Sequence, residues 1–203
     1  RAIGHLMKTR GLPKIDENRF IELCKLTISK LKELSTLIRI SSPAIVIGDL
    51  HGSIIDLLRI FKIYGLSNLF NNCTDSNLIS ETQRFIFLGD YVDRGQFSVE
   101  VIALLFSAFC LFPNTIVLLR GNHEFTAVCS NYGFKDELLD HPANYSPELY
   151  KMINDTFAFL SYSAIINDHI FCVHGGLSQE LKALSDIENL TAQRPIYEYK
   201  DTK

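Results

Sequence analysis

The sequence lacks three features that would each point to a particular class of protein. Its five cysteines are widely spaced and form no CxxC pair, so the pattern predicts no disulfide framework and fits the reduced thiols of the cytosol or nucleus. No apolar run reaches the roughly 18 residues of a membrane-spanning helix, and no signal peptide is recognised. The net charge of −3 offers no surplus of one sign for nucleic acid or an anionic membrane. We therefore expect a cytoplasmic or nuclear protein that binds neither.

What the 203 residues do contain is an alternation of apolar strands and helices, in one domain large enough to bury a core. The predicted strands cover Ala44 to Ile47, Phe85 to Leu88 and Thr115 to Leu119, and the predicted helices cover Ile54 to Ile63 and Phe97 to Leu111. Near-continuous apolar strands separated by helices are typical of a sheet that helices cover. The predicted fold class is therefore α/β.

The second half of the chain shows a different pattern. Ser146 and Pro147 predict a helix start, with serine as the cap and proline in the first turn. Two apolar runs follow, Ser163 to Ile166 and Ile170 to Val173, and they flank a polar turn. This arrangement predicts a hairpin that delivers the next residue, His174, at its exit.

Three further segments are predicted from their residue patterns. Apolar residues recur at helical spacing from Lys14 to Ile40, with Asp16 as a start signal, which predicts one or two helices that cover the domain. Residues 68–81 are polar and turn-rich and are predicted to form a surface loop. Beyond Leu177 the chain again turns polar, and no further element is predicted.

Four junctions between a predicted strand and the following loop carry chemically active side chains. They are Gly48-Asp49-Leu50-His51-Gly52, Gly89-Asp90-Tyr91-Val92-Asp93-Arg94-Gly95, Gly121-Asn122-His123-Glu124 and His174-Gly175-Gly176. Loops at the carboxyl ends of strands are where α/β proteins place binding and catalytic groups. Together the four loops predict one metal site.

Five of these side chains are candidate metal ligands. Asp49 and His51 are two residues apart, so both can face the same side of an extended chain. Asp90 is the candidate carboxylate for bridging two ions, while Asn122 offers a carbonyl oxygen and His174 a further imidazole. Two ions about 3.5–4 Å apart would hold both oxygens of an in-line displacement and would lower the pKa of a bridging water. Manganese is the first candidate for such ligands, with iron, zinc or magnesium as alternatives.

Three further side chains are candidate catalytic residues. His123 follows the candidate ligand Asn122 and, when protonated, can donate a proton to a leaving alkoxide. Asp93 is the candidate acidic partner that keeps His123 oriented and protonated. Arg94 carries a planar fork that matches phosphate oxygens and that lysine does not duplicate. These residue types predict attack on a phosphate ester.

The motifs GDLHG, GDYVDRG, RGNHE and HGGLS, in this order and spacing, resemble the signature of the phosphoprotein phosphatase family of serine/threonine phosphatases. The resemblance spans Pro43 to Ser178 and includes YGFKDE at Tyr132 to Glu137, which is similar to the family's YGFYDE segment. It implies a four-layer metallophosphoesterase sandwich, in which helices flank two β-sheets, with a dinuclear metal site. We accordingly divide the chain into a helical cover over residues 1–43 and a catalytic domain over residues 44–203.

The resemblance also assigns a role to each candidate residue. It places Asp49, His51 and Asp90 on one ion, and Asp90, Asn122 and His174 on the other. It makes His123 and Asp93 the proton-donating pair and Arg94 a phosphate-binding residue. It implies hydrolysis of phosphoserine and phosphothreonine by in-line attack of a metal-bridging hydroxide, with phosphoproteins as substrates and regulatory subunits as candidate partners.

The sequence departs from the family pattern after the last motif. The family carries a further metal-binding histidine, a second phosphate-binding arginine and more strands there, whereas no histidine follows Ser178. We therefore expect a C-terminally truncated chain with an incomplete second sheet. This departure leaves a binding protein without catalysis as one alternative. A metallophosphoesterase for small molecules is the other, although Glu124 stands where such enzymes usually carry aspartate.

Other residues are expected to have no part in the chemistry. The histidines outside the motifs, which are His5, His141 and His169, are expected to be solvent-exposed. The apolar side chains within or beside the motifs are expected to serve packing; they are Leu50, Tyr91, Val92 and Phe125.

Overall fold

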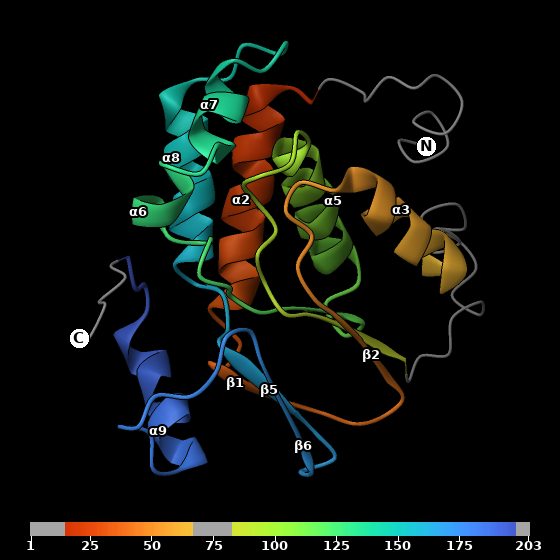
Figure 1. Cartoon of the computed structure of the whole chain (residues 1–203), viewed down its shortest axis with the longest axis vertical. Coiled ribbons are helices and arrows are strands. Elements are labelled where there is room, and N and C mark those ends of the chain that lie inside the picture. The colour runs from red at the N-terminus through yellow and green to blue at the C-terminus, as the bar shows by residue number, and fades with distance from the viewer. Residues whose placement is uncertain (1–14, 67–82, 198–203) are drawn as a thin grey trace.

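The computed structural model describes residues 15–66 and 83–197, and every element named below lies in these ranges (Figure 1). The helices are α2 (Glu17–Leu31), α3 (Ile54–Ile63), α5 (Ser98–Leu111), α6 (Thr126–Cys129), α7 (Phe134–Leu139), α8 (Pro147–Phe157) and α9 (Leu184–Asn189), and the 3-10 helix η1 covers Leu190–Gln193. The strands are β1 (Leu37–Ile40), β2 (Ala44–Ile47), β3 (Arg84–Phe87), β4 (Ile116–Leu118), β5 (Ser163–Ile166) and β6 (Ile170–Val173).

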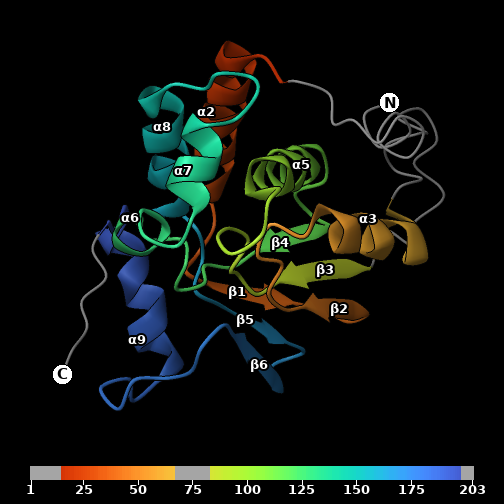
Figure 2. The ribbon, with the colours of Figure 1, turned by 45° about the horizontal axis from the view of Figure 1, so that its top comes forward.

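These elements stack in four layers, which Figure 2 shows from the side. Helices α3 and α5 cover one face of the sheet β2-β3-β4, and the sheet β1-β5-β6 lies against its other face. Helix α9 packs on the outer face of that second sheet. The predicted helix-flanked β-sandwich is therefore confirmed.

The strand directions decide where the loops gather. Strands β2, β3 and β4 are all parallel, with Ile45 opposite Phe85 and Phe85 opposite Ile116. The loops after these three strands consequently leave from the same edge of the sheet. In the second sheet β1 is parallel to β5, and β5 is antiparallel to β6, which ends one residue before His174.

Strand β3 shows why an uninterrupted apolar run suits this position. Phe85 and Phe87 belong to the core beneath the helices, whereas Ile86 belongs to the core between the two sheets. Successive residues of a strand point to opposite faces, so a strand buried on both sides needs apolar residues throughout. Burying each of these side chains contributes about 1.5–3 kcal/mol. The strand is thereby fixed just before the loop that carries Asp90.

Two helices begin where the sequence signals predict. Asp16 caps α2 by accepting a hydrogen bond from the Arg19 amide at 3.1 Å. Ser146 caps α8, and Pro147 is the first helical residue. Both start signals are confirmed.

The prediction of helix up to Ile40 is wrong at its C-terminal end. Helix α2 ends at Leu31, and Leu37–Ile40 form strand β1. This strand pairs with β5, with Ile38 opposite Ala164. Over so few residues the apolar pattern fits the period of a helix and that of a strand equally well. Pairing with a strand far along the chain decides that these residues form a strand. The predicted cover over residues 1–43 is thus not helical throughout, and the division of the chain at residue 43 stays a prediction.

The structure also contains helices where none was predicted. Helices α6 and α7 follow the third loop, and α9 with η1 follows the last one. Each is six residues or shorter, so a helical period barely repeats within it. In α9 a single buried residue, Ile187, packs against Leu37 and Ile165 of the second sheet and anchors the helix.

His141 is not the exposed side chain that the sequence suggests. Its side chain is only 15% exposed, and its Nε2 lies 3.1 Å from Oε1 of Glu100. Its ring stacks on Tyr145 with centroids 4.9 Å apart. Burial between these two partners corrects the prediction for His141, whereas His169 is exposed as predicted.

Two predictions fall outside the described ranges. They concern His5 and the surface loop over residues 68–81. Among the helices that the structure describes, none is both long and apolar enough to cross a membrane.

Candidate metal centre

The loops after β2 and β3 are joined through their backbones. The amides of Leu50 and His51 both donate to the carbonyl of Asp90, at 3.0 and 2.9 Å, and the amide of Gly52 donates to the carbonyl of Tyr91 at 2.9 Å. These bonds join the first two motifs and keep the backbones of His51 and Asp90 close together.

The loops after β3 and β4 are in direct contact, which only glycine permits. A Cβ built on Gly121 would lie 2.2 Å from Oδ1 of Asp90, and one built on Gly89 would lie 2.1 Å from the Gly121 amide nitrogen. Side chains at these positions would push the two loops apart. The glycines of the motifs thus let the third loop approach the first two.

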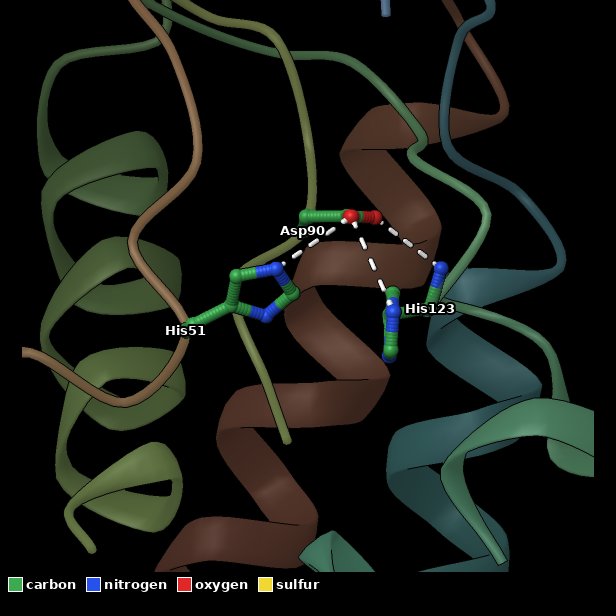
Figure 3. A group of neighbouring side chains, drawn as sticks. All are labelled: His51, Asp90 and His123. Carbon is green, nitrogen blue, oxygen red and sulfur yellow. Dashed lines mark hydrogen bonds and ion pairs between the residues drawn. The ribbon is translucent and has the colours of Figure 1, made fainter. Parts of the chain in front are cut away.

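Asp90 lies at the centre of the resulting cluster, as Figure 3 shows for three of its members. Its Oδ2 is 3.6 Å from Nε2 of His51, 3.3 Å from Nε2 of His174 and 4.0 Å from Nε2 of His123. Two groups of side chains offer ligand atoms within 4.8 Å of one another: His51 with Asp90 and His123, and Asp49 with Asp90 and His174. Asp90 is common to both groups.

The remaining candidate ligands lie in the same cluster. Oδ2 of Asp49 is 3.7 Å from Nε2 of His51, and its Oδ1 is 3.9 Å from Nδ1 of His174. Oδ1 of Asn122 is 3.0 Å from Nε2 of His174. All five predicted ligands are therefore brought together, from four loops and both sheets.

The tautomer and the orientation of the His51 ring suit a metal ligand. Its Nδ1 lies 2.8 Å from the carbonyl of Val92, which can only accept, so Nδ1 carries the proton. The buried Nε2 has no hydrogen-bond partner among the described residues and faces the carboxylates of Asp49 and Asp90. An imidazole that donates one N–H to a carbonyl and presents its other nitrogen to acidic groups has the usual arrangement of a metal ligand.

The electrostatics of the cluster reflect the crowding of charged groups. Burial opposes ionisation of Asp90, but hydrogen bonds from His174 and from the His123 amide outweigh it, so the pKa of Asp90 lies below its ordinary value. The hydrogen bond to Asp90 in turn raises the pKa of His174, although burial partly opposes this shift. The site thus keeps a carboxylate charged at its centre.

Backbone strain is concentrated in the same loops. Four site residues have left-handed backbones: His51 (φ 40°), Asp90 (φ 55°), Asp93 (φ 72°) and Arg94 (φ 64°). Such angles are costly for residues other than glycine and persist where surrounding contacts over-determine them. They are a frequent property of functional sites.

The candidate catalytic residues lie beside the ligands. Nδ1 of His123 is 2.6 Å from Oδ2 of Asp93, and both side chains are buried. Nη2 of the exposed Arg94 is 3.4 Å from Nε2 of His123. The carboxylate, the imidazole and the guanidinium thus form a row that leads from the interior to solvent.

A family profile described as calcineurin-like phosphoesterase matches residues 42–202. The chain belongs to the calcineurin-like phosphoesterase family. Among curated proteins, a serine/threonine-protein phosphatase of Caenorhabditis elegans is 38% identical over 198 residues, which cover 96% of this chain and 40% of that protein. A putative serine/threonine-protein phosphatase of Schizosaccharomyces pombe is 42% identical over 173 residues, which cover 85% of this chain and 52% of that protein.

The fold of this family member is similar to that of a solved structure. It is a protein serine/threonine phosphatase from Saccharomyces cerevisiae with similarity to human phosphatase PP5. The TM-score is 0.77 at 26% sequence identity, and the match covers 92% of this chain and 57% of that one. The predicted membership among the phosphoprotein phosphatases is confirmed by these relatives, and the chain spans about half of their length.

Sequence reasoning missed the part that Glu124 plays in the candidate metal centre. The side chain is fully buried, its Oε2 accepts from the amides of Asp90 and Gly121, and its Oε1 accepts from the amide of Tyr91. Burial raises the pKa of Glu124 to about 7, although these three amides oppose the shift. Glu124 holds the loops after β3 and β4 together, and its place in the RGNHE motif was the signal that could have revealed it.

Arg120 and the packing residues complete the support of the site. Nε and Nη2 of Arg120 donate to the carbonyl of Glu124 at 3.0 and 2.9 Å, and its guanidinium lies 3.6 Å from the centre of the Phe125 ring. Leu50, Tyr91 and Val92 are buried as predicted, and Phe125 is half-buried. The apolar residues of the motifs therefore serve the packing that was expected of them.

Proposed function

We propose that this phosphoesterase is a metal-dependent serine/threonine protein phosphatase that hydrolyses phosphoserine and phosphothreonine. The observation that carries the proposal is the position of Asp90, which belongs to both groups of ligand atoms. A carboxylate shared in this way is suited to a pair of ions rather than a single one. The names of the relatives support phosphoprotein substrates, and regulatory subunits are proposed as further partners.

We assign the metal ligands as the family resemblance implies. Asp49, His51 and Asp90 would hold one ion, and Asp90, Asn122 and His174 the other. When bound, two such ions supply the acidity that makes water a nucleophile near neutral pH and the charge that neutralises phosphate oxygens. Oxygen and nitrogen donors suit manganese, iron or zinc, with manganese as the ion to add first.

The residues beside the ligands would perform the remaining tasks. Arg94 is exposed next to His123, so its planar fork can bind two oxygens of a phosphate that lies over the ligands. His123 would donate a proton to the alkoxide of serine or threonine as it leaves. Asp93 fixes the orientation of the His123 ring and faces the positive charge that the ring carries as a donor.

The test is hydrolysis of a phosphothreonine peptide by the 203-residue chain in the presence of Mn²⁺. The Asp90→Asn and His123→Asn variants should each lose at least about 100-fold in kcat. Matched controls are Asp168→Asn and His169→Asn, because both side chains are exposed and lie in the turn between β5 and β6, away from the candidate ligands. Equal turnover in Asp90→Asn and the parent chain would contradict the proposal. Absence of turnover in a folded, metal-loaded chain would favour a binding protein instead.

We also propose that the protein functions in the cytoplasm or nucleus. The cysteines that the structure describes, Cys24, Cys110, Cys129 and Cys172, are all free thiols. Free thiols in this number are typical of reducing compartments. Location of a fluorescent fusion of the chain tests the proposal, and secretion would contradict it.

A further inference from the structure

One motif of the sequence has no role in the proposed chemistry so far, and its position in the structure suggests a role. The segment Tyr132–Glu137, which we call the clamp segment, lies against the loop that carries Asp93 and Arg94. The carbonyl of Tyr132 accepts from the Arg94 amide at 3.2 Å, and the amide of Phe134 donates to Oδ1 of Asp93 at 2.9 Å. The two residues that bind the clamp segment are thus the proposed phosphate ligand and the partner of His123.

These two residues need external support. Asp93 and Arg94 are consecutive, and both have left-handed backbones, with φ of 72° and 64°. Neither is glycine, so each carries a conformational cost that surrounding contacts must offset. The two hydrogen bonds from the clamp segment hold one residue by its side chain and the other by its amide. The clamp segment therefore stabilises the conformation that aims Arg94 at the site.

The clamp segment is held in place at two points of its own. The Phe134 ring is fully buried and packs against Tyr150 and Phe157, with centroids 5.8 and 6.2 Å away. Gly133 has φ of 117°, an angle that side chains avoid, and it turns the chain between Tyr132 and Phe134. The second anchor is Glu137, on helix α7.

Glu137 caps a helix to which it does not belong. Its Oε1 accepts from the amide of Val99 at 3.1 Å, in the first turn of α5. First-turn amides have no partner within their own helix, and Phe97 at the N-cap offers no side-chain acceptor. A carboxylate near a helix N-terminus is further favoured by the helix dipole. Glu137 thus connects α7 to α5, the helix that begins three residues after Gly95.

We propose that Glu137 is a positioning residue for phosphate binding. By capping α5 from α7, it fixes the clamp segment against Asp93 and Arg94, so that Arg94 presents its guanidinium to the phosphate. Among the described residues, the hydrogen bonds from the clamp segment into the site go to Asp93 and Arg94 and not to the five candidate metal ligands. Metal binding should consequently be independent of Glu137. The inference rests on the proposed function, since it takes Arg94 as the phosphate ligand.

The experiment compares Glu137→Ala with Glu137→Gln and with the matched control Asp136→Ala. Asp136 is the exposed neighbour on the same helix. Inorganic phosphate is the probe, and its binding to the Mn²⁺-loaded chain is measured by calorimetry and, where turnover occurs, as competitive inhibition. We expect Glu137→Ala to weaken phosphate binding about tenfold and to raise KM similarly, at nearly constant Mn²⁺ affinity. Glu137→Gln keeps an acceptor for the Val99 amide and should restore most of the loss.

The remaining arms of the experiment separate the positioning role from a general loss of stability or of metal binding. Glu137→Asp keeps the charge but moves the carboxylate away from the Val99 amide, so its phosphate affinity should resemble that of Glu137→Ala. It replaces Glu137→Ala if the alanine variant does not fold. Unchanged phosphate affinity in folded Glu137→Ala would overturn the proposal, and so would equal losses of Mn²⁺ and phosphate affinity. Because phosphate binding is measured without turnover, the outcome does not depend on whether the chain hydrolyses phosphopeptides. A chain without turnover would weaken the proposed function alone.

Discussion

Nδ1 of His123 lies 2.6 Å from Oδ2 of Asp93, and the two side chains are 3% and 0% exposed. The other carboxylate oxygen of Asp93 accepts from the Phe134 amide, so the acid is held at both oxygens. A buried acid fixed in this way leaves the imidazole one orientation. In that orientation the Nε2 of His123 points towards Asp90 and Arg94.

The first prediction follows from this geometry. His123→Asn should lower kcat by about 10²–10⁴-fold, because proton donation to the leaving group is lost. KM and Mn²⁺ affinity should change by less than about threefold, since Nδ1 is occupied by Asp93 and His123 is not among the proposed ligands. Steady-state kinetics and calorimetry measure the two effects. A parallel loss of Mn²⁺ affinity would make His123 a ligand, as its grouping with His51 and Asp90 allows.

Arg94 gives the second prediction. Arg94→Ala should weaken binding of inorganic phosphate by about 10–100-fold, which is the range expected from losing charged hydrogen bonds worth about 1.5–3 kcal/mol. Arg94→Lys should recover only part of this loss, because an ammonium group cannot make the two parallel bonds of a guanidinium. Inhibition constants for phosphate provide the measurement. Full recovery with lysine would show that charge alone matters.

The third prediction concerns pH and metal binding. The hydrogen bond to Asp90 raises the pKa of His174 in the metal-free protein, so a proton occupies the ligand nitrogen over more of the near-neutral range. A metal ion must displace that proton. Mn²⁺ affinity should therefore fall as pH decreases through the raised pKa of His174, by up to about tenfold per pH unit. Calorimetry across the near-neutral range tests this, and a constant affinity would contradict it.

The fourth prediction uses two glycines of the motifs as a matched pair. Gly121→Ala should disrupt the site, because the added Cβ would lie 2.2 Å from Oδ1 of Asp90 and 2.5 Å from its amide. Gly48→Ala places a Cβ that has no atom of the described residues within 4 Å, and it serves as the control. We expect Gly121→Ala to cost about 1–3 kcal/mol in the free energy of unfolding and most of the Mn²⁺ affinity. Urea unfolding and calorimetry measure both, and equal behaviour of the two variants would refute the prediction.

The candidate ligands could be identified from sequence because each stands at the end of an apolar strand. Three of those strands are parallel, so the topology itself collects Asp49, Asp90 and Asn122 at one edge. The hairpin that delivers His174 also lies within the predicted boundaries. Local sequence patterns were therefore sufficient to predict those ligands whose position depends on strand order.

Features that depend on distant partners were not accessible in this way. Strand β1 is defined by pairing with β5, which no local pattern in Leu37–Ile40 reveals. The roles of Glu124 and Glu137 were not predicted from the sequence for a related reason, since both carboxylates bind backbone amides from other loops or helices. The motifs mark both glutamates as candidates, but an amide donor is present at nearly every residue, so the sequence does not identify which amides each carboxylate binds.

The strand order has a consequence for how the molecule is held together. Asp49, His51, Asp90 and Asn122 follow strands of one sheet, whereas His174 follows β6 of the other. The ion bound by Asp90, Asn122 and His174 would act as a cross-link between the two sheets, in addition to the apolar side chains that pack between them. Separation of the sheets would then require loss of His174 from this ion, so the chain should resist unfolding increasingly as the concentration of free metal rises.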